Sequence, residues 1–168
     1  MKSVITLLIL FLIAGCSSRK TDKELFDDAQ KNLNQDKIPE AVLAFEELTN
    51  EYPESNFAPE ALSQLASIYQ GKRIKSISET ESLQKAVSIF KKIHDEYPKS
   101  QYAPTSLFMA GFINANELKN YNEATSLFKQ FLKEYPENDL AASAQAELDN
   151  MGLTPEDILK KTLTNEDK

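Results

Sequence analysis

Three stretches of the chain repeat one another in register: EAVLAFEELTNEYPESNFAPEALSQLASIY from Glu40, KAVSIFKKIHDEYPKSQYAPTSLFMAGFIN from Lys85 and EATSLFKQFLKEYPENDLAASAQAELDNMG from Glu123. Each contains an alanine, a phenylalanine four residues later, and then a Glu-Tyr-Pro triplet. Residues four positions apart share one face of a helix, where alanine lets a neighbouring helix approach and the phenylalanine ring fills the space beside it. Self-similarity at such a spacing predicts a repeat architecture.

The Tyr-Pro dipeptides are expected to end helices. The residue before proline avoids the α region, and proline cannot continue the hydrogen-bond ladder. Each repeat is therefore predicted to be two antiparallel helices. The first helices are expected at 23–33, 58–69 and 104–114, each with a small residue near its middle: Ala29, Ala66 and Gly111. The second helices are expected to start near Pro39, Leu83 and Asn122 and to end just before each Tyr-Pro.

The residues that flank these helices fit the same plan. An apolar residue three positions before each matched alanine is expected to close the turn within the hairpin; these are Ile38, Leu83 and Tyr121. Beyond the third repeat, 141–151 is predicted to be a capping helix ended by Gly152. Thr154-Pro155-Glu156-Asp157 favours the start of a short last helix, and disorder is expected from Thr164 to Lys168.

The pattern of a small residue, Ala-x-x-x-Phe and then Pro is similar to the tetratricopeptide repeat over about residues 22–152. The resemblance implies an all-α, tetratricopeptide-like helical-hairpin repeat solenoid of about three repeats plus C-terminal capping helices. The Y-P-x-S-x-[YF]-A pattern at 52–58 and 97–103 resembles the branch that contains the BamD-like outer-membrane assembly lipoproteins and the C-terminal domain of the Tol-Pal coordinator YbgF. The closing stretch, 135–151, looks more like the YbgF end.

Residues 1–16, MKSVITLLILFLIAGC, have the layout of a signal peptide, with Lys2 followed by an apolar run from Val4 to Ala14. A helix of this run spans only about 17 Å, against a hydrocarbon core of about 30 Å, so a permanent transmembrane helix is not expected. Ile13-Ala14-Gly15-Cys16 resembles the bacterial lipobox. The resemblance implies that 1–15 are a lipoprotein signal peptide, that Cys16 is acylated, and that 16–21 form a short linker; the alternative is an ordinary cysteine.

A serine after the lipobox cysteine goes with outer-membrane sorting in proteobacterial lipoproteins, and Ser17 occupies that place. We therefore expect a lipid anchor in the outer membrane that faces the periplasm. The alternative location is the outer face of the cytoplasmic membrane. Ser17 to Asp22 reach only about 20 Å when extended, so the repeat domain is expected close to the lipid headgroups.

The rest of the sequence argues against catalysis, metals and nucleic acids. The net charge is −7, whereas nucleic-acid binders normally carry a basic surface. One cysteine and one histidine cannot supply a structural zinc site. The chain also lacks a Gly-rich phosphate loop and H-E-x-x-H, and His94 is interpreted as a packing or surface residue. We predict that the protein is not an enzyme and needs no cofactor or metal.

The predicted function is a membrane-anchored scaffold for protein–protein interaction in the cell envelope, in outer-membrane protein assembly. The alternatives are a Tol-Pal or cell-division-associated periplasmic coordinator, or an accessory subunit of an envelope enzyme complex. The candidate partner-binding groove lies on the first helices and comprises Phe26, Gln30, Ser63, Ser67, Phe108 and Phe112. The alternative is that these rings pack between adjacent repeats. Residues 70–82 form a second candidate partner surface, or a tolerated insertion.

Overall fold

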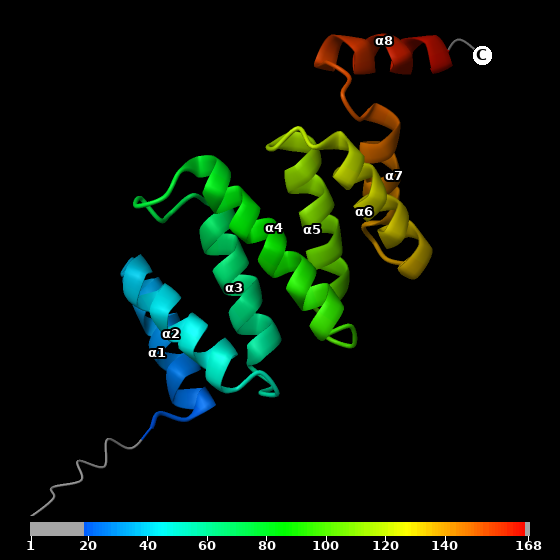
Figure 1. Cartoon of the computed structure of the whole chain (residues 1–168). Helices are drawn as coiled ribbons and strands as arrows, with labels where there is room; N and C mark the ends of the chain where they lie inside the picture. Colours follow the sequence, from blue (N-terminus) through cyan, green and yellow to red (C-terminus); the bar gives the residue numbers. More distant parts are fainter. Residues whose placement is uncertain (1–18, 167–168) are drawn as a thin grey trace, which may run out of the picture.

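The computed structural model describes residues 19–166 (Figure 1). The predicted signal peptide and Cys16 lie outside the described residues, as do residues 167–168. Within 19–166 there are eight helices and no strand. They are α1 (Asp22–Asn34), α2 (Ile38–Glu51), α3 (Ala58–Gln70), α4 (Glu79–Glu96), α5 (Ala103–Asn116), α6 (Tyr121–Glu134), α7 (Ala141–Asn150) and α8 (Pro155–Glu166).

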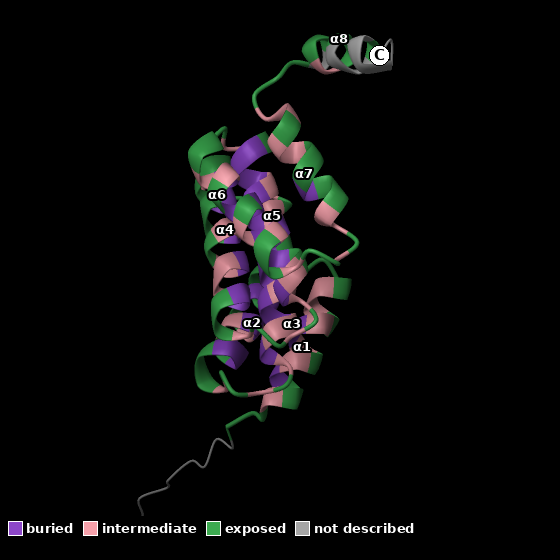
Figure 2. Cartoon of the chain, turned by 90° about the vertical axis from the view of Figure 1, so that its right-hand side faces the viewer, coloured by how far each residue is buried: buried purple, intermediate pink, exposed green. Residues whose placement is uncertain are grey.

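The helices form three hairpins, α1–α2, α3–α4 and α5–α6, which stack side by side, with α7 packed against the last hairpin (Figure 1). The matched Ala and Phe residues lie in the core, as the repeat pattern predicts. Their members are all buried: Ala41, Ala86, Ala124, Phe45, Phe90 and Phe128. Buried residues gather where the helices face one another, whereas the described side chains of α8 include no buried one (Figure 2). The all-α hairpin solenoid is confirmed.

The solenoid has two edges that differ in their turns (Figure 1). One edge, here called the Tyr-Pro end, holds the start of α1 and the turns at 52–57, 97–102 and 135–140, which join successive repeats. The opposite edge, here called the hairpin end, holds the connections within repeats at 35–37, 71–78 and 117–120. A residue with positive φ lies in each of those three connections: Asp36 at 58°, Lys72 at 53° and Lys119 at 56°.

Gly111 marks the crossing of α5 and α6. A Cβ at this position would lie 3.0 Å from the ring of Phe128, which is fully buried and cannot move aside. The small residue near the middle of α5 is therefore required by the close approach of α6. Gly152 has φ of 77° after α7, as a glycine that ends a helix does.

The start of α4 and the place of Tyr121 differ from the expectation. α4 starts at Glu79 rather than near Leu83, because Ser78 caps it by accepting a hydrogen bond from the Glu81 amide at 3.1 Å. Tyr121 is 40% exposed, unlike the buried Ile38 and Leu83. Its ring lies beside Gly152, in the turn after α7, so it does not close the hairpin turn as a staple.

The last helix is longer than expected. α8 runs to Glu166, so Thr164 belongs to a helix and not to a disordered tail. Thr154 caps this helix, because its hydroxyl accepts a hydrogen bond from the Asp157 amide at 3.2 Å.

α8 does not lie along α7 as α6 lies along α5 (Figures 1 and 2). Pro155-Glu156 matches Pro39-Glu40 of α2, which places Asp157 where α2 has its buried Ala41. A charged residue at this packing position explains why α8 does not complete a fourth hairpin.

Candidate functional site

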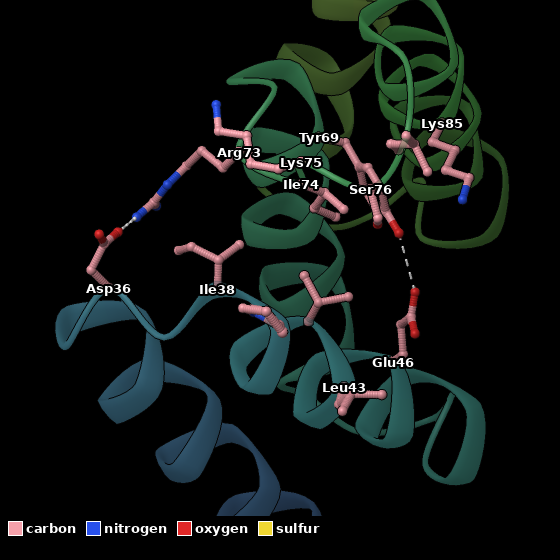
Figure 3. A pocket seen from close by; sticks show the side chains of 13 residues that line it. Asp36, Ile38, Leu43, Glu46, Tyr69, Arg73, Ile74, Lys75, Ser76 and Lys85 are labelled. Atoms are coloured by element: carbon pink, nitrogen blue, oxygen red, sulfur yellow. Dashed lines mark hydrogen bonds and ion pairs between the residues drawn. The ribbon is translucent and has the colours of Figure 1, made fainter.

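A groove of about 780 Å³ opens at the junction of the first two repeats (Figure 3). It lies between α2, the C-terminal end of α3 and the connection at 71–78, with Lys85 of α4 at its edge. This connection has eight residues, whereas the corresponding connections at 35–37 and 117–120 have three and four. The extra length lets the segment 71–78 form one wall of the groove.

The centre of the groove is apolar. α2 supplies Ile38, Pro39, Val42 and Leu43, and the segment 71–78 supplies Ile74 and Ile77. Leu43 is 65% exposed, although a leucine in a closed core would be covered. Figure 3 shows Ile38 and Ile74 extending into the space between α2 and the segment. A concave, mostly apolar site with a few polar groups at its margins is typical of a binding site.

Polar contacts mark the two ends of the groove (Figure 3). At one end, Arg73 Nη2 lies 2.6 Å from Asp36 Oδ1. At the other end, the Tyr69 hydroxyl donates to Glu46 Oε1 at 3.4 Å, and Lys85 Nζ lies 5.5 Å from the centroid of the Tyr69 ring. Burial, together with the charge of Glu46, raises the pKa of the Tyr69 hydroxyl, so Tyr69 stays neutral at physiological pH.

The segment 71–78 is tied to the helices around it. Lys72 Nζ lies 3.1 Å from Glu117 Oε2 and 3.5 Å from Glu79 Oε2, and its hydrogen bond to Glu117 raises the pKa of the lysine. Just beyond the segment, the buried Ser82 hydroxyl donates to the Tyr69 carbonyl at 2.6 Å. These contacts hold the segment in place. Between the first two repeats, α2 packs less extensively on α3 than α4 packs on α5 between the second and third repeats. The groove is thus larger than the hollow of about 370 Å³ between α4, α5 and α6 at the junction of repeats two and three.

The six residues predicted to form a groove on the first helices do not line this opening. Phe26 stacks on Phe57 of the following turn with ring centroids 4.9 Å apart. Phe108 is buried, with its ring 5.5 Å from Phe128 and 5.9 Å from Phe131. Phe26 thus packs against the turn that leads into the second repeat, whereas Phe108 packs inside the third repeat. The other four remain at least partly accessible: Gln30, Ser63, Ser67 and Phe112.

The second predicted surface, 70–82, does contribute to the groove through its middle part. Gln70 belongs to α3 and 79–82 belong to α4, which leaves 71–78 as the connection. Sequence reasoning did not identify Leu43. A signal was available, because Leu43 stands two residues after the matched alanine, where the other repeats have Ser88 and Ser126. A leucine at a position that is otherwise serine indicates an exposed apolar group.

His94 has the contacts of a structural residue. Its ring is buried between two carboxylates, with Nδ1 2.8 Å from Asp95 Oδ1 and Nε2 2.8 Å from Glu134 Oε2. Burial alone would lower its pKa, but the hydrogen bonds to Asp95 and Glu134 outweigh burial and raise it. Among residues 19–166, no group of three or more His, Cys, Asp or Glu side chains is placed to hold a metal ion. No helix in this part of the chain is long and apolar enough to cross a membrane.

Residues 105–138 match the family model described as "Tetratricopeptide repeat". The chain contains a tetratricopeptide repeat. The match covers most of α5, all of α6 and the Tyr-Pro turn that follows. Tetratricopeptide repeats generally bind protein partners and typically serve as non-catalytic scaffolds. No curated protein compared with the chain matches it.

Proposed function

We propose that the protein is a lipid-anchored scaffold of the cell envelope that binds a peptide segment of a partner protein in the groove between α2 and 71–78. The observation that carries this proposal is Leu43, which is 65% exposed within an apolar groove whose ends are polar. Apolar anchors surrounded by polar groups are how a helical groove recognises an apolar stripe on a peptide. The tetratricopeptide repeat at 105–138 supports a role in protein binding.

The envelope location rests on the sequence before the described residues. The lipobox-like Ile13-Ala14-Gly15-Cys16 supports acylation of Cys16, and Ser17 supports an outer-membrane anchor that faces the periplasm. Two or three acyl chains anchor a protein stably, whereas one anchors it only marginally. On the resemblance to BamD-like lipoproteins, we propose that the scaffold acts in outer-membrane protein assembly. A Tol-Pal-associated role and an accessory role in an envelope enzyme complex are the alternatives.

A photoreactive benzoylphenylalanine in place of Leu43 tests the groove. After illumination of intact membranes, we expect one major adduct whose partner is identified by mass spectrometry. Binding of that purified partner is then measured for Leu43→Ser and for Leu159→Ser. Leu159 is a matched control, because it is 61% exposed on α8, away from the groove. Weakened binding in Leu43→Ser alone supports the groove, and unchanged binding in both variants rejects it.

Labelling of cells with palmitate tests the anchor. We expect the label on the wild-type protein and its loss in Cys16→Ser, together with release of the variant from the membrane fraction. A wild-type protein without label would reject the lipid anchor. The groove would be untouched by that result, because its test is made with purified partner.

A further inference from the structure

The first described residues are fixed to the Tyr-Pro end of the solenoid. The Tyr52 hydroxyl donates to the Lys20 carbonyl at 2.7 Å. The Arg19 guanidinium pairs with Glu51 and lies over the Tyr52 ring, 5.9 Å from its centroid. Lys20 Nζ lies 2.7 Å from Asp28 Oδ2 of α1. The chain that leads into α1 is therefore attached at several points and does not swing as a free linker.

A hydrogen bond of the same kind, from a Tyr-Pro tyrosine to a backbone carbonyl, also joins successive repeats. The Tyr97 hydroxyl donates to the Pro53 carbonyl at 2.8 Å, so the tyrosine of the second Tyr-Pro turn bonds the backbone of the first. For Tyr52 the backbone of Lys20 takes the place of a preceding turn. Ser55 strengthens this arrangement by donating to Asp22 Oδ2 at 2.6 Å. The segment before α1 thus packs on the first repeat as an additional turn of the Tyr-Pro end.

From these contacts we infer that the Tyr-Pro end faces the membrane, while the groove faces the aqueous compartment. This inference rests on the proposed acylation of Cys16. Only Ser17 and Ser18 separate Cys16 from the fixed Arg19, and this length of chain spans at most about 11 Å. The groove begins at the hairpin end, where Asp36 and Arg73 lie, about one helix length of roughly 20 Å away. A partner then reaches the groove from the aqueous side.

Electrostatic adhesion does not explain this orientation. The Tyr-Pro end has no excess of exposed basic side chains: its turns expose Glu54, Glu137, Asp139 and Lys99, and the segment before α1 adds Arg19 and Lys20. Without such an excess, anionic headgroups do not attract this edge, so it does not adhere to lipid by charge. The orientation comes from the short covalent tether and the fixed linker. We therefore expect it to be independent of the anionic lipid content of the membrane.

Photocrosslinking to lipid tests the orientation in the full-length protein in bacterial membranes. Benzoylphenylalanine replaces Glu54, in the first Tyr-Pro turn, or Ser76, in the segment 71–78; both positions are exposed. Lipid adducts are quantified with phosphate-labelled phospholipids, and palmitate labelling is measured in the same cells. We expect a several-fold higher adduct yield from position 54 than from position 76. An equal yield, or a higher yield from 76, in palmitate-labelled protein overturns the orientation but leaves the anchor intact.

Three further variants link the orientation to the linker. Insertion of about ten Gly and Ser residues between Ser18 and Arg19 adds a flexible span of roughly 17 Å, which should remove most of the difference between the two positions. Tyr52→Phe should reduce the difference in adduct yield, because it removes the hydrogen bond to the Lys20 carbonyl, whereas Tyr97→Phe should keep it, because it removes the same kind of bond between repeats. A difference that persists after the insertion overturns the inference. Absence of palmitate from the wild type overturns both the anchor and the orientation.

Discussion

The chain has two junctions between successive hairpins, and they differ in how tightly side chains pack across them. Between repeats two and three, α4 packs closely on α5, and α4 is tied to α6 by Lys91–Glu123 at 2.7 Å. His94 and Glu134 form a second contact between these helices at 2.8 Å. Between repeats one and two, a groove of about 780 Å³ remains, with Leu43 65% exposed.

This difference shows how a short solenoid divides stability and binding. In a repeat protein each unit contacts only its neighbours, so stability is roughly a sum of repeat and junction contributions. A well-filled junction between repeats two and three can therefore stabilise the array while the first junction stays partly open. Because the segment 71–78 is held by Lys72 and the helices around it, the opening keeps its shape before a partner arrives. A preformed site lowers the cost of binding.

The largest expected effect is at Phe108, in the core of the third repeat, on which the filled junction is built. Phe108→Ala removes a buried ring that contacts Phe112, Phe128 and Phe131. We expect the free energy of unfolding, measured by urea denaturation, to fall by about 3–5 kcal/mol. Phe108→Leu keeps most of the buried volume and should cost much less. A loss below about 1 kcal/mol in the alanine variant would mean that this ring contributes to a surface and not to the core.

Gly111 offers a sharper test of the packing within the same repeat. In an ordinary exposed helix, Gly→Ala stabilises by about 1 kcal/mol, because alanine is the better helix former. Here the new Cβ would lie 3.0 Å from the Phe128 ring, so we expect Gly111→Ala to destabilise by about 1–3 kcal/mol. Ala66 is the matched residue of the preceding repeat. A gain in stability in Gly111→Ala would show that the α5–α6 crossing relaxes easily.

His94 is expected to make the filled junction sensitive to pH. Its raised pKa means that its pairing with Asp95 and Glu134 stabilises fully below about pH 6.5, the ordinary histidine value, and is lost as pH rises through the folded-state pKa. The lowered pKa of Glu134, caused mainly by its bond to His94, means that its share is lost as pH falls below about 4.5.

The difference in unfolding free energy between wild type and His94→Gln should therefore be largest between these two pH values and shrink towards pH 9. We expect a maximum of about 1 kcal/mol, since Glu134 is partly exposed to solvent. Glu134→Gln should reproduce most of the effect. Parallel stability curves for wild type and His94→Gln across this pH range would show that His94 stays neutral in the folded protein.

The hairpins and their ends could be predicted from the sequence because each depends on local chemistry. Tyr-Pro ends a helix wherever it occurs, and Ala-x-x-x-Phe defines a buried face without reference to distant residues. The second helices accordingly end at Glu51, Glu96 and Glu134, each just before its Tyr-Pro. The start of α4 was missed, because the Ser78 cap lies inside a stretch that looked like a loop.

The groove could not be predicted in the same way, since it depends on how two repeats meet. Phe26 and Phe108 are both aromatic residues of first helices, but their surroundings come from other segments of the chain: Phe57 of the turn before α3 for the first and Phe128 of α6 for the second. Likewise, the segment 71–78 was recognised as an extra length of chain, while its position over α2 follows only from the packing of α2 and α3. Comparison of Leu43 with Ser88 and Ser126 was the one local clue.

The smallest expected effect is at the end of the groove. Arg73→Ala removes the ion pair with Asp36, whose side chains are 38% and 85% exposed. Exposed pairs contribute little because water and salt screen them, so we expect a loss below about 0.5 kcal/mol in unfolding free energy. Lys91→Ala is the matched change at the filled junction, where both side chains are about half covered, at 44% and 39% exposure, and should cost about 0.5–1 kcal/mol. If Arg73→Ala cost more than Lys91→Ala, the Asp36–Arg73 contact would be part of the structure that joins repeats one and two. The first junction would then depend on the Asp36–Arg73 ion pair across the groove, and a partner that enters there would have to break this ion pair.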